Sequence, residues 1–210
     1  MIPPVKERLE AYAKRRKLEI VEKIGKGYSS EIYLVKDATE KNAMRTEHSL
    51  ERVEALPALK FALKIEKPKS PRQNMAKKEA ENLALANRVG VGPRLIDYDG
   101  ENRIILMEYV EGKTMKEFIF SKKAPSKTVL QKFLTELFQQ AGRLDKAGLS
   151  HGQLAGKGTN ILVRKNLPVI IDFEKASAKR KCNNVLQLTS LLVTNKKGAM
   201  AGKVKGILGG

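Results

Sequence analysis

The sequence predicts an α+β protein in two parts, a strand-rich first part (residues 1–110) and a helical second part (residues 111–210). One observation is the alternation of apolar and polar residues, typical of half-buried strands, in residues 18–27, 29–38 and 59–65. A second is the segment 126–148, whose apolar residues form one broad helical face between Ser126 and Gly148. We expect the two parts to join near residues 108–112.

The remaining elements follow in chain order. Residues 4–18 and 75–90 have helical patterns, and the second of these ends at Gly90. Two hairpins are predicted, over 92–110 with a turn near Asp99–Gly100 and over 160–173. A last helix is predicted over 184–193. We expect residues 37–57 to form a polar loop with a short helix near 49–56, and residues 195–210 to be loose.

Length and composition limit the class of protein. A chain of 210 residues with 41% hydrophobic and 30% charged residues is large enough to bury a core. Its one cysteine, Cys182, excludes an internal disulfide framework and fits a reducing compartment. Because no apolar run is long enough for a signal core or a bilayer span, we expect a cytoplasmic protein without membrane contact.

The net charge of +18 favours polyanionic partners. Residues 173–210 contain eight lysines and arginines against one acid, Glu174. A basic surface could therefore contact RNA or a ribonucleoprotein, although aromatic residues, at 5%, do not indicate base stacking. The alternative is a lysine-rich surface that only aids solubility.

Small residues lie between the first two predicted strands. Gly25 and Gly27 form a glycine-rich turn, and Ser30 takes the position of the third glycine of a GxGxxG pattern. Such a turn allows backbone N–H groups to approach phosphates closely. An ordinary hairpin turn would have the same composition, so this motif alone is weak.

Lys64 lies within the apolar strand segment 59–65. Burying an unpaired ammonium is costly, so the side chain either points to solvent at a sheet edge or meets an anion. Glu79 in the following helix is the suggested partner, and Glu81 is the alternate.

Asn160 and Asp172 lie at opposite ends of the second predicted hairpin. Both carry oxygen atoms of the kind that Mg²⁺ prefers. We expect His151 to be a structural residue of the preceding turn, whereas Lys157 either reaches a phosphate or is solvated. The other histidine, His48, lies in the polar insert, so no histidine-based metal cluster is proposed.

The order of these elements resembles the signature set of protein kinases. A glycine-rich hairpin, a strand lysine, a helix glutamate, a Met-Glu-Tyr hinge, a histidine turn with an asparagine, and Asp-Phe follow one another. Over roughly residues 18–193 the chain resembles the small atypical kinases, close to the RIO kinases and the kinase of the KEOPS tRNA-modification complex. It is most similar to predicted archaeal Ser/Thr kinases with an "HG[EQ]L" turn.

The resemblance implies a protein-kinase-like two-lobed fold, with a β-rich N-lobe over 1–110 and a short, truncated helical C-lobe over 111–210. It also implies roles for individual residues with ATP and Mg²⁺ as cofactors. Gly25 and Gly27 would lie over the ATP phosphates, and Lys64 would contact the α- and β-phosphates and pair with Glu79. Met107 would line the adenine pocket, Glu108 and Val110 would bond adenine through their backbones, and Asn160 and Asp172 would hold Mg²⁺.

Several residues depart from the kinase pattern. Gln153 stands where the catalytic Asp is usual, and the interval from there to Asn160 is two residues longer. Glu174 replaces the Gly after Asp-Phe, and no Ala-Pro-Glu segment follows. A Gln can orient a substrate hydroxyl but cannot take its proton. Glu174 is a possible substitute acid, against the alternative that it faces solvent or pairs with a lysine.

The sequence therefore predicts an ATP- and Mg²⁺-dependent atypical Ser/Thr protein kinase, slow because of Gln153 and able to phosphorylate itself. Its catalytic residues would be Gln153, Lys64 and Asp172. The alternative is a nucleotide-binding pseudokinase that acts as a switch or scaffold in a ribonucleoprotein. A small-molecule kinase is disfavoured, because such enzymes usually need a larger C-terminal lobe.

Overall fold

The computed structural model describes residues 2–38, 59–70, 74–195 and 197–209. These residues form two compact units, one made of Met1–Lys77 with Ile96–Tyr109 and the other of Lys78–Leu95 with Val110–Gly210. The sequence predicts an N-lobe over residues 1–110 and a C-lobe over residues 111–210, and this division stays a prediction. The short helix expected near 49–56 lies outside the described residues.

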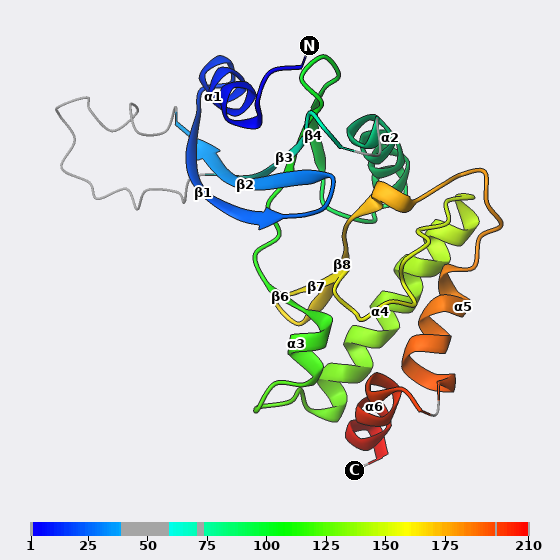
Figure 1. Cartoon of the computed structure of the whole chain (residues 1–210). Helices are drawn as coiled ribbons and strands as arrows, with labels where there is room; N and C mark the ends of the chain where they lie inside the picture. Colours follow the sequence, from blue (N-terminus) through cyan, green and yellow to red (C-terminus); the bar gives the residue numbers. More distant parts are fainter. Residues whose placement is uncertain (1, 39–58, 71–73, 196, 210) are drawn as a thin grey trace, which may run out of the picture. The chain divides into compact units, whose positions relative to one another are not determined.

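The first unit is built on a five-stranded sheet in the order β1-β2-β3-β5-β4 (Figure 1). Antiparallel pairing joins β1 to β2, β2 to β3 and β3 to β5. The strands are β1 (Leu18–Lys26), β2 (Ser30–Asp37), β3 (Lys60–Glu66), β4 (Leu95–Asp99) and β5 (Ile104–Glu108). This sheet confirms the strand alternation and the predicted hairpin over 92–110, with β4 and β5 as its arms.

Helix α1 (Val5–Arg15) lies against this sheet and closes its core (Figure 1). Leu9 and Tyr12 on one face of the helix are buried, as the helical spacing predicts. Their apolar partners from the strands include Val35, Leu63 and Ile65. The Tyr12 hydroxyl donates to Asp97 Oδ2 at 2.6 Å, and burial together with this carboxylate raises the pKa of Tyr12.

The alternation along β3 sends Lys64 to the face opposite Leu63 and Ile65, which pack in the core. β3 is hydrogen-bonded on both sides, by β2 and β5, and Lys64 is only 7% exposed. This excludes the alternative that Lys64 points to solvent at a sheet edge.

Glu66 at the end of β3 fixes the start of α2 (Met75–Arg88). Its Oε2 accepts from the Ala76 N–H at 2.9 Å, and its Oε1 accepts from Arg103 at 3.0 Å. A carboxylate at a helix N-terminus is favoured by the free N–H groups and the helix dipole. This buried bond therefore joins the strand that carries Lys64 to the helix that carries Glu79.

The second unit contains most of α2, a three-stranded sheet and a group of helices (Figure 1). The sheet has the order β6-β7-β8, and α4 packs against β8. Its elements after α2 are β6 (Lys113–Thr114), α3 (Met115–Ile119), α4 (Lys127–Lys146), β7 (Ile161–Arg164), β8 (Leu167–Ile170), the 3-10 turn η2 (Phe173–Lys175), α5 (Asn184–Thr189), the π-helical turn η3 (Ser190–Thr194) and α6 (Ala199–Gly209). The structure confirms the mixed α+β class, with sheet first and helices after.

The long predicted helix forms as α4, and the sequence signals explain both of its ends. The Ser126 hydroxyl accepts from the Val129 N–H, and Gly148 adopts a φ of +73° just beyond the end. The hairpin predicted over 160–173 also forms, as β7 and β8. By contrast, β6 and the short helix α3 were not expected, although Thr114 and Glu117 form a capping box at the start of α3.

The expectation that residues 195–210 are loose is wrong. Residues Ala199–Gly209 form α6, which contacts α3, α4 and η3. Met200, Ala201 and Val204 are buried, and their spacing places them on one helical face. Three glycines and a weak apolar pattern in this segment concealed a helix that tertiary packing stabilises. No helix among the described residues is both long and apolar enough to cross a bilayer.

Candidate active site

The glycine-rich hairpin joins β1 to β2. The Gly27 N–H donates to the Ser30 carbonyl at 2.9 Å and closes the turn, while Gly25 lies opposite Ile32 in the ladder. The Lys67 ammonium donates to the carbonyls of Gly27 at 2.6 Å and Tyr28 at 3.3 Å. The turn predicted to cover phosphates is therefore held by a lysine that sequence reasoning did not identify. Its Lys-x-x-Lys spacing from Lys64 is the one signal that could have found it.

The predicted hinge residues lie at the end of β5. Glu108 is half-buried and pairs with Phe61 of β3, and Val110 is buried. The Tyr109 N–H donates to the Lys60 carbonyl at 3.3 Å, so this backbone leaves the sheet in a fixed direction. Lys64 and these hinge residues belong to the first unit, except Val110, and their ATP-binding roles remain predictions.

His151 is fully buried, as expected for a structural residue of its turn. Its Nε2 lies 2.9 Å from the Ile171 carbonyl, and because a carbonyl only accepts, Nε2 carries the proton. Nδ1 is buried with no hydrogen-bond partner in the described part of the chain, as suits a nitrogen without a proton. Burial lowers the pKa of His151, so the ring is neutral. The ring edge also packs on Phe173, with centroids 5.0 Å apart.

The turn that holds His151 is tied to α5 by Asn184. This asparagine is completely buried, and its Oδ1 accepts from the His151 N–H at 2.8 Å. Its Nδ2 donates to the Leu149 carbonyl at 2.8 Å and to Asp145 Oδ1 at 2.7 Å. Farther along the turn, the Leu154 N–H donates to Gln187 Oε1 at 3.0 Å. One helix therefore fixes both ends of the turn that carries Gln153.

Gln153 itself is half-buried, and its side-chain oxygen Oε1 is buried without a hydrogen-bond donor among the described residues. Buried acceptors usually have a donor, so this oxygen lacks a partner that is usual in such surroundings. Lys157, four residues later, is exposed in the loop before β7. The structure gives Lys157 no fixed phosphate-facing position, and its role stays a prediction.

Asn160 and Asp172 are brought to the same end of the β7–β8 hairpin. The Asn160 carbonyl accepts from the Ile171 N–H at 2.9 Å, one residue before Asp172. Asp172 adopts a left-handed φ of +66°, uncommon for a residue with a side chain, and this conformation turns the chain from β8 into η2. The pairing of β7 with β8 thus brings the backbones of the two residues predicted to hold Mg²⁺ close together.

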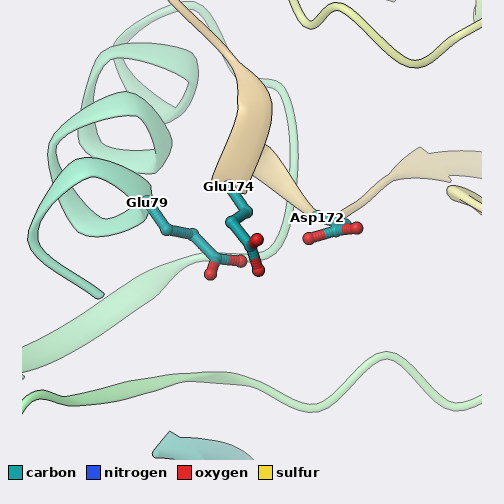
Figure 2. Close-up of side chains that lie close together, drawn as sticks. All are labelled: Glu79, Asp172 and Glu174. Atoms are coloured by element: carbon teal, nitrogen blue, oxygen red, sulfur yellow. The ribbon is translucent and has the colours of Figure 1, made fainter. Parts of the chain in front are cut away.

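Three carboxylates gather beside this turn. Glu79 of α2, Asp172 and Glu174 of η2 each offer one oxygen, and these oxygens all lie within 4.8 Å of one another (Figure 2). Figure 2 shows the Glu79 and Glu174 side chains reaching toward each other, with Asp172 alongside. Such oxygens, together with the nearby Asn160, suit a hard divalent cation. We refer to Glu79, Asp172 and Glu174 as the acidic cluster.

The acidic cluster is held together by contacts between α2 and η2. Asn82, on α2, donates from Nδ2 to the carbonyls of Phe173 at 3.3 Å and Ala176 at 2.8 Å. The Phe173 ring fills the space beside Gly92, where a Cβ would lie only 2.8 Å from Cε2. The helix and the Asp-Phe-Glu turn therefore form one packed block.

Sequence reasoning named all three acids but not their shared position. Glu79 was expected to pair with Lys64, and Glu174 was weighed as a substitute acid or a solvated residue. Glu174 is in fact half-buried beside two other carboxylates. The Asp-x-Glu spacing of Asp172 and Glu174 is the only sequence signal for this grouping.

The chain is similar to known proteins over part of its length. The chain is 37% identical over 97 residues to "KEOPS complex subunit Bud32" of Pyrococcus abyssi, covering 46% of this chain and 42% of that protein. It is 29% identical over 103 residues to "EKC/KEOPS complex subunit BUD32" of Yarrowia lipolytica, covering 40% and 41% respectively. The matched region thus spans about two fifths of each curated relative. Residues 22–188 match the family described as "RIO domain", and the chain therefore belongs to this kinase-like family.

Proposed function

We propose that the protein is an ATP- and Mg²⁺-dependent atypical kinase that phosphorylates serine or threonine, including its own. The observation that carries this proposal is the acidic cluster beside Asn160 in a chain of the RIO domain family. Phosphoryl transfer depends mainly on positioning and on neutralising phosphate charge, and a carboxylate-bound Mg²⁺ supplies both.

In this proposal each predicted residue has a definite task. Asp172 and Asn160 hold Mg²⁺, and Glu174 adds a third oxygen ligand. Gly25, Gly27 and Ser30 lie over the phosphates. Lys64 and Glu79 orient the nucleotide, the backbones of Glu108 and Val110 bind adenine, and Lys157 contacts a phosphate.

Gln153 determines the expected rate. The amide oxygen of a glutamine can accept a hydrogen bond from a substrate hydroxyl and orient it. It cannot remove the proton, and general-base assistance is typically worth about 10²- to 10⁴-fold. The enzyme is therefore expected to be slow but active.

The direct test follows phosphate transfer from labelled ATP over time. We expect the wild type to label itself or an added protein in the presence of Mg²⁺, and Asp172→Asn to reduce the rate at least about tenfold. Glu81→Gln is the matched control, because Glu81 is an exposed acid on the same helix as Glu79. Equal rates for wild type and Asp172→Asn would contradict the proposal.

A second candidate is a nucleotide-binding pseudokinase that acts as a switch or scaffold. One observation favours it: Gln153 stands where kinases usually have the catalytic aspartate, and an amide cannot take up the substrate proton. It predicts that ATP and Mg²⁺ raise the unfolding temperature without any phosphate transfer. Transfer that is abolished by Asp172→Asn would exclude it.

We further propose a cytoplasmic protein that works with partner proteins and contacts RNA through its basic surface. The two relatives are named as subunits of a complex, and the net charge of +18 favours a polyanion. Binding of a basic surface releases cations from the RNA, and this release is less favourable at high salt. RNA affinity should therefore fall steeply as the salt concentration increases. A salt-independent affinity would remove the electrostatic part of this proposal.

A further inference from the structure

Gly152, next to Gln153, lies against the guanidinium of Arg180. A Cβ at Gly152 would lie 2.5 Å from Arg180 Nη2, 3.0 Å from Nη1 and 3.1 Å from Cζ. The backbone φ of Gly152 is +79°, a conformation that glycine tolerates best. The space of a side chain at position 152 is therefore already filled by an arginine that is distant in sequence.

The same guanidinium joins two segments that flank the acidic cluster. Arg180 Nη2 donates to the Ser150 carbonyl at 3.4 Å, in the turn that carries Gln153. It also donates to the carbonyl of Lys175, the residue after Glu174. Beside it, Ser150 and Ser177 exchange backbone hydrogen bonds of 3.0 and 2.8 Å. The arginine thus closes the gap between the Gln153 turn and the end of η2.

The kinase signature His-Arg-Asp places an arginine directly after the histidine, at the position of Gly152 here. We propose that Arg180 is a positioning residue that replaces this arginine from a different place in the chain. By holding Ser150 and Lys175 together, it keeps Gln153 and the acidic cluster at a fixed separation. The structural part of this inference stands alone, whereas its effect on catalysis rests on the proposed function.

The contacts with the Ser150 and Lys175 carbonyls depend on the planar guanidinium group of Arg180. Its N–H groups can reach both carbonyls at once while its two terminal nitrogens lie nearest the glycine. A lysine offers a single ammonium and no such plane, so it can restore only part of the contact. Because Arg180 is exposed, its loss should alter geometry more than overall stability.

The packing is tested by a double-mutant cycle read out by thermal unfolding. We expect Gly152→Ala to lower Tm in the wild type by several degrees, because the backbone there is left-handed and the added Cβ displaces the guanidinium from its two carbonyls. In the Arg180→Ala background the same change should cost clearly less, because the space is vacated. Additive losses would overturn the proposed contact.

Gly148→Ala is the matched control for this cycle. Gly148 has a similar φ of +73°, but nothing lies within 4 Å of its added Cβ. Its effect on Tm should be the same with and without Arg180. A dependence of the Gly148 effect on Arg180 would show that the coupling is not local, and would also overturn the contact.

The positioning role is tested by kinetics on the full chain. Arg180→Ala should lower kcat about tenfold with KM for ATP unchanged, and Arg180→Lys should recover part of the loss. Lys179→Ala, the exposed neighbour, should have wild-type kcat. If Arg180→Ala leaves kcat unchanged, or changes only KM, the positioning role is overturned. If the wild type transfers no phosphate, the proposed function fails while the double-mutant cycle still decides the contact.

Discussion

The turn at residues 150–154 and the glycine-rich hairpin at residues 25–30 differ sharply in how they are held. In the turn, His151 is fully buried and a buried asparagine, Asn184, binds its backbone. In the hairpin, Tyr28 is 74% exposed, and the Lys67 ammonium binds the loop through exposed hydrogen bonds. Both regions are predicted to serve one reaction.

The contrast indicates that the two regions have different roles. Buried hydrogen bonds to the backbone fix a geometry, and the turn that carries Gln153 needs a fixed geometry to serve a reaction. A loop with solvent-exposed bonds has lower local stability and can adjust to a nucleotide that enters and leaves. Changes in the turn should therefore cost folding stability, and changes in the hairpin should affect ligand binding.

The largest expected effect follows removal of the buried asparagine. Asn184→Ala leaves the His151 N–H and the Leu149 carbonyl without partners, and should lower the free energy of unfolding by about 3 kcal/mol. The measurement is equilibrium urea unfolding. Lys181→Ala, at an exposed side chain three residues earlier, should change the free energy by less than about 0.5 kcal/mol. Equal losses for the two variants would remove the contrast between the regions.

The next effect is a pH dependence that belongs to the turn. Burial lowers the pKa of His151 from its usual 6.5, so the unfolded chain binds a proton that the folded chain resists. This contribution to stability is fully present above pH 6.5 and is lost as the pH falls toward the lowered pKa. The slope approaches at most about 1.4 kcal/mol per pH unit.

The check is urea unfolding at several pH values between 7.5 and 5.5, a window chosen above the usual pKa values of carboxyl groups, about 4. His151→Gln should flatten the curve in this range. His48→Gln, at the second of the chain's two histidines, is the control and should keep the wild-type slope. A slope that follows His48 instead would show that the buried ring is not the titrating group.

The smallest effect on stability is expected in the hairpin. Lys67→Ala removes two exposed hydrogen bonds and should change the free energy of unfolding by less than about 1 kcal/mol. Affinity for ATP, measured by calorimetry, should nevertheless fall severalfold, because a loop without these two bonds is less ordered and binding must then order it. Lys69→Ala, at a nearby exposed lysine, should leave affinity unchanged. A Lys67 variant with lower stability and normal affinity would reverse the assignment of roles.

The sequence predicted the parts of this fold that depend on local patterns. Alternation along β3 placed Lys64 among apolar residues, and the structure buries it in a central strand. Ser126 and Gly148 marked both ends of α4 correctly. These features depend on spacing and capping, which neighbouring residues determine.

What the sequence did not predict depends on contacts between distant segments. α6 forms because Met200 and Val204 find buried positions in the second unit, not because its glycine-containing segment favours a helix. The grouping of Glu79 with Glu174 requires α2 to pack on η2. Tertiary packing of this kind leaves no periodic trace in a single sequence, and the same holds for Arg180 beside Gly152.

The central claim is that the acidic cluster holds a divalent cation together with ATP. Mn²⁺ reports on such a site, because the free ion and the bound ion are distinguished by electron paramagnetic resonance. We expect tight Mn²⁺ binding by the wild type with a non-hydrolysable ATP analogue, and about ten- to hundredfold weaker binding by Asp172→Asn. Glu174→Gln should weaken binding as well, and Glu81→Gln should not. Unchanged Mn²⁺ affinity in Asp172→Asn would contradict the claim.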